Sequence, residues 1–230
     1  GRQKRLVLGL PGHKLGGAAA LSLSGVAFLL LALSSVSFDG LKHTFFWLDL
    51  IGINPLEFPG RSAVTGESSL GLVVMFGLLF SGFMGAVWLG CRLAGKRGVR
   101  KLAGLLAWSI IPIALAYHFS HYLVGFTINS QYALAALSDP LMRGWNLFGT
   151  AGMHVQAGAT LGAQSAWIIW NAQAVAIIGG HVLAVILAHL IAYRHFGSAR
   201  LATVSQIPLA ILMVGYTVFG LWLLSAPTAG

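Results

Sequence analysis

The chain has 230 residues, of which 57% are hydrophobic and only 8% are charged, against roughly 25% charged residues in soluble domains. This composition excludes an ordinary soluble domain and predicts a membrane protein. The net charge of +9 would suit nucleic-acid binding, but the uneven placement of the basic residues indicates membrane topology instead, so we expect no nucleic-acid partner.

Five apolar stretches are long enough to cross a hydrocarbon core of about 30 Å, which takes about 20 residues of helix. Backbone exposed to lipid must satisfy its own hydrogen bonds, so the stretches are predicted to be helices. We expect a single all-α domain over residues 1–230, a polytopic membrane helix bundle with five transmembrane helices at Gly16–Val36, Ser69–Gly90, Leu102–Val124, Ser165–Ala192 and Ser205–Ser225.

The basic residues lie mostly on one side of the predicted membrane, and all five acidic residues lie on the other. The positive-inside rule therefore places the N-terminus in the cytoplasm and the C-terminus outside. The basic side holds Arg2, Lys4, Arg5, Lys14, Arg92, Lys96, Arg97, Arg100, Lys101, Arg194 and Arg200, and the other side holds Lys42, Arg61 and Arg143 with Asp39, Asp49, Glu57, Glu67 and Asp139.

The segments between the helices carry further signals. Phe38–Gly52 is aromatic and amphipathic, so it predicts a helix lying in the outer membrane interface. The long segment Gly125–Gln164 either folds back over the bundle as a lid or simply connects two helices. Cys91 is the single cysteine of the chain, so no intrachain disulfide forms. We interpret it as a small apolar side chain at the inner end of the second helix.

Within the helices, small residues recur every fourth position and indicate close helix packing. Such stripes occur at Gly77, Ser81 and Gly85 in the second helix and at Gly180, Ala184 and Ala188 in the fourth. In the third helix, Pro112 predicts a kink, because proline lacks the N–H that would bond to the carbonyl one turn earlier.

Histidines within the spans are the main candidate functional residues. At 1.5 Å of rise per residue, His118 and His121 lie about 8 and 12 Å outside the membrane midpoint, level with Asn171 and Gln173, while His181 lies about 3 Å inside it. His189 lies about 15 Å inside, too far from His121 to share a metal ion. Tilt and the proline kink can bring His118 and His181 together.

An ionisable residue near the bilayer centre is a functional-site hypothesis by default, and imidazole is a common ligand of metals and of haem iron. The sequence thus predicts a transition-metal or haem b site with His118 and His181 as cofactor ligands and with His121 or His154 as further metal ligands or supporting residues. The alternatives are interfacial positions for His121 and His189, and a hydrogen bond from His118 to Gln173 or Asn171 that only joins two helices.

A resemblance appears in the segments SVSFDG (Ser35–Gly40), IALAYHFSHYL (Ile113–Leu123), SDP with WNLFGTAG (Ser138–Pro140 and Trp145–Gly152), GHVLAVILAH (Gly180–His189) and SQIPLAILMVGYTVFGLWLLS (Ser205–Ser225). In these segments the chain resembles the C-terminal half of a family of bacterial multipass membrane proteins catalogued as fenitrothion hydrolase-like. The resemblance implies a place in the bacterial inner membrane and an upstream membrane half or partner membrane subunits. It also marks His118, His121, Asp139, His154, His181 and His189 as candidates within matching segments.

Three functions remain open. In the first, the histidines hold a metal or haem for envelope redox chemistry or metal handling. In the second, they hold a metal that activates water for the hydrolysis of lipophilic esters or organophosphate triesters, with Asp139 as a candidate base. The third is a structural subunit without a site. Because no carboxylate lies within a predicted span, ligation by imidazole alone, and so the first function, is favoured.

Overall fold

The computed structural model describes residues 15–57, 60–156, 158 and 162–228. Within these residues, five helical stretches are long and apolar enough to cross a membrane, which confirms the predicted multipass helix bundle. They are α1 (Leu23–Leu41), α3 (Thr65–Leu93), α4 (Val99–Leu106) continued by α5 (Ile110–Ser138), α6 (Ala163–Phe196) and α7 (Ala199–Ser225).

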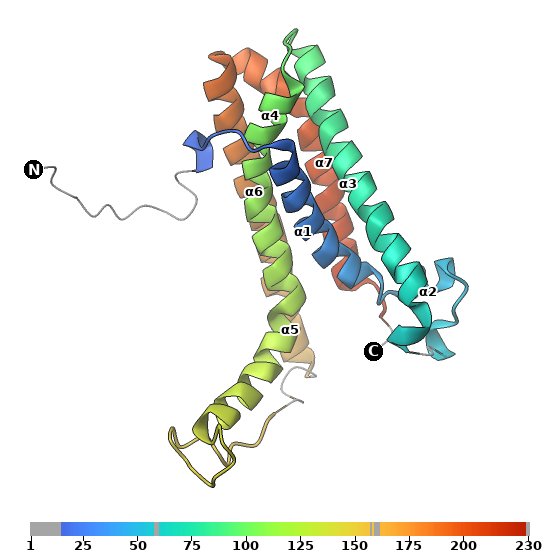
Figure 1. Ribbon diagram of the computed structural model, residues 1–230, viewed down its shortest axis with the longest axis vertical. Coiled ribbons are helices and arrows are strands. Elements are labelled where there is room, and N and C mark those ends of the chain that lie inside the picture. Colours follow the sequence, from blue (N-terminus) through green and yellow to red (C-terminus); the bar gives the residue numbers. More distant parts are fainter. Residues whose placement is uncertain (1–14, 58–59, 157, 159–161, 229–230) are drawn as a thin grey trace, which may run out of the picture.

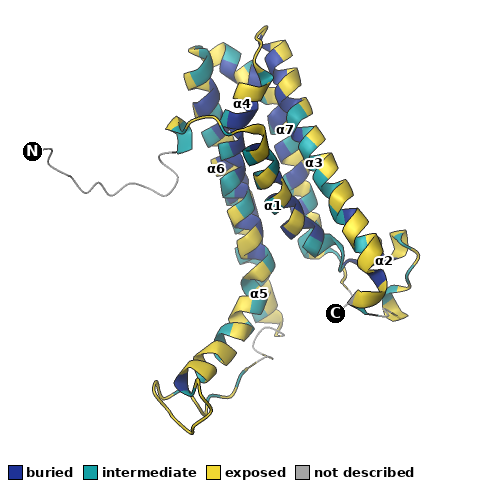
Figure 2. Cartoon of the chain, in the orientation of Figure 1, coloured by how far each residue is buried: buried dark blue, intermediate teal, exposed yellow. Residues whose placement is uncertain are grey.

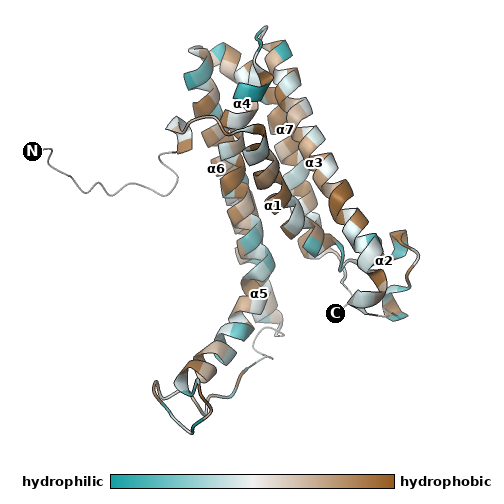
Figure 3. Cartoon of the chain, in the orientation of Figure 1, coloured by the Kyte–Doolittle hydropathy of each residue, from teal (hydrophilic) through white to brown (hydrophobic). Residues whose placement is uncertain are grey.

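The long helices pack in a closed ring, in the order α1, α3, α7, α6, α5 and back to α1 (Figure 1). Their inner faces form one buried core that includes Leu30, Phe83 and Ile177 (Figure 2). Large apolar side chains such as Phe28 and Leu78 are exposed on the outer faces, and hydrophobic residues cover most of the bundle (Figure 3). An apolar outer surface is what a bundle surrounded by lipid requires.

The two ends of the bundle differ. One end holds the short helix α2 (Phe45–Leu50) and the described part of the C-terminus, and we name it the α2 end. The other, the α4 end, holds the α3–α4 and α6–α7 turns (Figure 1). The described basic residues of the predicted inner side all belong to the α4 end. Arg2, Lys4, Arg5 and Lys14 lie outside the described residues, and the orientation in the membrane remains a prediction.

The first helix begins and ends later than predicted, at Leu23 and Leu41 instead of Gly16 and Val36. The Ser22 side chain caps the helix by accepting a hydrogen bond from the Gly25 N–H at 3.2 Å, and such a cap fixes a helix start. The later end brings Asp39 into the helix. This corrects the expectation that no span contains a carboxylate, as does Glu67 in the first turn of α3.

The third span is interrupted and longer than predicted. A 3-10 turn at Ala107–Ser109 separates α4 from α5, directly before Pro112, where the missing proline N–H weakens the helix. α5 then continues to Ser138 and not only to Val124. It extends beyond the other helices, so the described part of the following loop lies past the end of the bundle and not over it (Figure 1).

Small residues allow close helix contacts at some predicted positions only. A Cβ on Gly180 would lie 2.6 Å from the Ala116 Cβ, so this glycine lets α6 approach α5. The stripe at Gly77, Ser81 and Gly85 is exposed, and a Cβ on either glycine would meet nothing within 4 Å. Within the described bundle this stripe packs against no other helix, and its role in helix packing stays a prediction.

The segment predicted as one interfacial helix is divided in two. Phe38–Leu41 is the last turn of α1, and α2 follows after Thr44, whose hydroxyl accepts from the Trp47 N–H at 3.2 Å. Phe38 and Trp47 pack edge to face with ring centroids 5.0 Å apart. These contacts hold α2 against the end of the bundle, and its position at the membrane interface remains a prediction.

Candidate functional site

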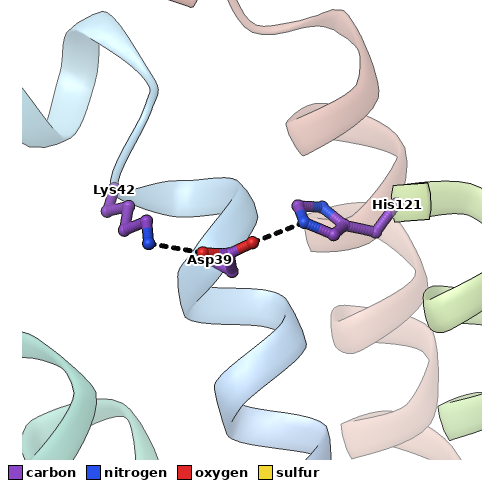
Figure 4. A network of polar contacts seen from close by, with 3 residues as sticks. All are labelled: Asp39, Lys42 and His121. Carbon is purple, nitrogen blue, oxygen red and sulfur yellow. Dashed lines mark hydrogen bonds and ion pairs between the residues drawn. The ribbon is translucent and has the colours of Figure 1, made fainter. Parts of the chain in front are cut away.

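Three charged or ionisable side chains meet at the α2 end of the bundle. The Asp39 carboxylate, in the last turn of α1, contacts Lys42 Nζ at 2.5 Å through Oδ1 and His121 Nε2 of α5 at 2.5 Å through Oδ2 (Figure 4). Since an ionised carboxylate only accepts hydrogen bonds, Nε2 of His121 is the donor. The lone pair of the neutral imidazole is then on Nδ1.

The position of Asp39 explains why it needs two partners. A carboxylate near the C-terminus of a helix faces the negative end of the helix dipole, which is unfavourable. Lys42, three residues later, and His121 from the neighbouring helix offset this cost with an ammonium group and a polarised N–H. The side chains of Asp39, Lys42 and His121 are 33%, 29% and 25% exposed, so water reaches the network.

Asp39 and Lys42 also line a cavity of about 490 Å³ between α1, the start of α3, and α5. One wall carries the hydroxyl groups of α3, and another carries aromatic and aliphatic groups. The cavity thus suits a ligand with one polar and one apolar side. Its lining residues are Ser35, Phe38, Asp39, Lys42, His43, Val64, Thr65, Ser68, Ser69, Leu72 and Tyr122.

A second polar group, the core cluster, lies inside the ring and consists of Ser37, Tyr117, His181 and Tyr216. Ser37 and Tyr216 share a hydrogen bond between their hydroxyls, and the Tyr117 hydroxyl donates to the Tyr216 carbonyl oxygen at 2.8 Å. The His181 ring lies 6.2 Å from the Tyr117 ring and 6.1 Å from the Tyr216 ring, between centroids. The cluster joins α1, α5, α6 and α7.

His181 is 5% exposed, and its Nδ1 donates to the Ile177 carbonyl oxygen at 2.8 Å. Its buried Nε2 has no hydrogen-bond partner among the described residues. An imidazole nitrogen with a free lone pair and the other nitrogen fixed by a carbonyl is typical of metal-bound histidine. The same arrangement also occurs where a buried ring only fills space.

His118 does not join His181. It is exposed, and its Nδ1 donates to the Ala114 carbonyl oxygen of its own helix at 2.8 Å. His181 instead packs on Tyr117, the neighbour of His118, which faces the core. Successive helical side chains point about 100° apart, so the face of α5 that presents Tyr117 to the core turns His118 outward.

The remaining candidates are dispersed. Asp139 follows α5, where its carboxylate accepts hydrogen bonds from the N–H groups of Arg143 and Gly144. At the rise per residue of an α-helix, it lies about 27 Å from His121 along the axis of α5. It holds a loop and is not near the histidines. His154 is exposed in that loop. His189 is half-buried beside a cavity of about 240 Å³ between α6 and α7.

The predicted metal site can be compared with these positions. Within the described residues, no three His, Cys, Asp or Glu side chains come together as metal ligands. His118, His121, His154 and His181 occupy four different surroundings. The described side chains therefore do not fit the predicted centre, and no chemistry is assigned to it.

The polar residues of α6 join helices. Gln173 Nε2 donates to the Ser120 carbonyl oxygen at 2.7 Å, and the Ser120 hydroxyl donates to the Gln173 carbonyl oxygen at 3.1 Å. Asn171 bonds instead to Trp167 of its own helix. The α5–α6 link expected from polar residues at this depth is present, but it uses Ser120 in place of His118.

No protein-family model, curated protein or solved structure matches the chain. The resemblance to the fenitrothion hydrolase-like family therefore stays a prediction, and the site rests on its own geometry.

Sequence reasoning found His121 but not its partners, Asp39 and Lys42. The sequence contained an indication of this pair. An acidic and a basic residue three positions apart at the end of an apolar stretch can form an ion pair on one helix face if the helix continues through them. Placing the end of the helix at Val36 assigned both residues to a separate interfacial helix at Phe38–Gly52, and not to the helix that packs against α5.

Proposed function

We propose that the chain is a membrane-embedded hydrolase of lipophilic esters or organophosphate triesters, with Asp39 as its general base and His121 as a residue that positions this base. The observation that carries the proposal is the Asp39 carboxylate, held by His121 and Lys42 at the wall of a half-polar cavity. The resemblance to the fenitrothion hydrolase-like family supports the same reaction class.

In the proposed reaction, a water molecule in the cavity attacks the phosphorus or carbonyl carbon of the bound substrate. Asp39 accepts a proton from this water as the new P–O or C–O bond forms, a role in which a positioned base contributes about 10² to 10⁴ in rate. The bond to the aryloxide or alkoxide breaks, and the leaving oxygen takes the bonding electron pair. His121 and Lys42 hold the carboxylate in position throughout.

Lys42 has a second role. Its ammonium group has three donors, and one of them contacts Asp39. The remaining donors offset the negative charge that develops on the phosphoryl or carbonyl oxygen in the transition state, a form of stabilisation that is strong in a partly desolvated site. Phe38 and Leu72 in the cavity wall provide apolar contacts for the lipophilic part of the substrate.

The proposal includes the setting of the site. With the N-terminus in the cytoplasm, the α2 end faces the outside of a bacterial inner membrane, and the substrate enters from the outer leaflet. An upstream membrane half or partner membrane subunits would cover part of the outer surface of the bundle.

The test is hydrolysis of a diethyl p-nitrophenyl phosphotriester by the full chain in lipid nanodiscs, followed by the absorbance of p-nitrophenolate. Replacement of the base in Asp39→Asn lowers the rate about 100-fold or more. Asp49→Asn is the matched control, because Asp49 is an exposed acid in α2 at the same end. Thermal unfolding of both variants checks that they fold. If Asp39→Asn retains the wild-type rate, the proposal fails.

A second candidate, metal or haem binding for redox chemistry or metal handling, is supported by one observation, the partnerless Nε2 of His181. Among the described residues, His181 belongs to no group of three His, Cys, Asp or Glu side chains that could hold a metal ion. A structural subunit without a site is the third candidate, and it is supported if neither hydrolysis nor a bound cofactor is found.

A further inference from the structure

A second cavity of about 490 Å³ lies at the α4 end, within the turn from α3 to α4. Three cationic side chains line it, Arg92, Lys96 and Arg97, together with Trp88. No acidic residue lines it, and the ion pairs of the described part of the chain all involve Asp39 at the opposite end. The cavity therefore gathers positive charge that no carboxylate of the described residues neutralises.

The backbone of the turn holds these cations around the cavity. The Gly95 N–H donates to the Arg92 carbonyl oxygen at 3.0 Å, and the Lys96 N–H donates to the Cys91 carbonyl oxygen at 2.9 Å. Gly95 and Gly98 have φ of +63° and +108°, conformations that glycine adopts without strain. These bonds close the end of α3 and turn the chain back, so that residues from both sides of the turn line one cavity.

The start of α4 adds to the attraction for an anion. Gly98 and Val99 line the cavity, and no side chain caps the first turn of α4. The first N–H groups of a helix carry partial positive charge and bind phosphate groups well. The cationic side chains and this helix start thus favour the same kind of ligand.

The surface next to the cavity is apolar. Trp88, Leu89 and Leu93 are 49%, 44% and 52% exposed on the last turns of α3, a helix that is long and apolar enough to span the membrane. The Arg92 guanidinium lies 5.3 Å from the centre of the Trp88 ring. Tryptophan settles at the level of lipid headgroups, so the cavity adjoins surface that acyl chains cover.

From this combination we propose that the cavity binds the phosphate headgroup of an anionic phospholipid, whose acyl chains lie along Trp88, Leu89 and Leu93. Arg92, Lys96 and Arg97 contact the phosphate oxygens. Basic pockets at the membrane surface between helices bind such headgroups. A free phosphate ion would use the same cations but gain nothing from the apolar surface.

The experiment is native mass spectrometry of the full chain, released from nanodiscs that contain phosphatidylglycerol and phosphatidylcholine in equal amounts. Phosphatidylglycerol is retained preferentially by the wild type. The double variant Lys96→Gln/Arg97→Gln lowers its apparent affinity about 30-fold. Arg194→Gln/Arg200→Gln removes the same charge at the same end of the bundle but outside the cavity, and it leaves the retention unchanged.

Two results would overturn the proposal. Equal loss of phosphatidylglycerol from both double variants would show general attraction to the basic end and no specific site. Displacement of the lipid by excess inorganic phosphate would identify a site for a free anion instead. Lipid that stays bound in excess phosphate supports the phospholipid site. Thermal unfolding in detergent confirms that both double variants are folded.

Discussion

The Asp39 network (Asp39, Lys42 and His121) and the core cluster share the helices α1 and α5 but differ in what surrounds them. Ser37 and Asp39 are two residues apart on α1, and Tyr117 and His121 are four residues apart on α5. At the α2 end, charged groups pair in 2.5 Å contacts beside a cavity. In the core, hydroxyl groups and rings pack without a charged partner.

The difference shows that polar residues in one membrane bundle serve two purposes. Burying a charge is costly unless it is paired, so the Asp39–Lys42 ion pair stands where water reaches it. Buried hydroxyls need only one hydrogen bond each to be satisfied, so they tie the helices together. We therefore expect substitutions in the core cluster to change stability, and those in the Asp39 network to change the rate of the proposed hydrolysis.

The largest effect on stability is expected from Gly220→Val, which tests the core cluster. A Cβ at Gly220 would overlap the Tyr117 hydroxyl, which has little room to move because Tyr117 is 5% exposed. Overpacking of this kind costs about 1–3 kcal/mol. The measurement is the unfolding free energy in detergent with increasing denaturant. Gly215→Val is the control on the same helix, since a Cβ there meets nothing within 4 Å. Equal losses of unfolding free energy in both variants would mean that the close contact between Gly220 and Tyr117 does not contribute to stability.

A smaller effect is expected from Tyr216→Phe, which removes the hydroxyl bonded to Ser37 and keeps the ring. A side-chain hydrogen bond between membrane helices contributes about 0.6–2 kcal/mol. A double-mutant cycle with Ser37→Ala isolates this bond, and we expect the two losses not to add. Hydrolysis of the phosphotriester per folded molecule stays at the wild-type rate. A fall in that rate would mean that the core cluster takes part in the reaction, and would remove the distinction between the two regions.

The sequence predicted the membrane bundle well, because hydropathy alone reports which stretches suit lipid. It predicted helix ends less well. The run from Gly16 to Leu21 is apolar enough to extend the first helix, yet the Ser22 cap starts it later. The other end extends to Leu41 because Asp39, unfavourable at that position alone, has partners in Lys42 and His121.

The site could be predicted only in part, because depth along a helix is readable from sequence while the direction of a side chain around it depends on the neighbours. His118 and His181 were predicted at depths that tilt and a kink could reconcile, but His118 is exposed on the outside of α5 while His181 is buried in the core. The two small-residue stripes make the same point. Both have the same spacing, but among the described helices only the stripe that begins at Gly180 faces another helix. Which face of a helix is packed depends on the neighbouring helices, and no local sequence pattern identifies those neighbours.

The smallest effect on stability is expected from His181→Phe. This variant tests whether the His181 ring only packs in the core or binds a metal. Nε2 of His181 is buried without a partner, and such a desolvated polar atom costs about 1–3 kcal/mol. Phenylalanine keeps the ring packing against Tyr117 and Tyr216. It removes that cost but also the hydrogen bond from Nδ1 to the Ile177 carbonyl oxygen. The two changes offset each other, so the unfolding free energy stays unchanged or rises slightly. If Nε2 binds a metal or haem iron in the purified protein, the same change removes the ligand and lowers stability.

Elemental analysis of the wild type beside His118→Ala and His181→Ala decides between these outcomes. Iron, zinc or copper that is lost in the His181 variant alone would make His181 a ligand without His118. Loss of the metal in both variants would restore the predicted pair of ligands. Metal content that neither variant changes would leave His181 as part of the packing of the core.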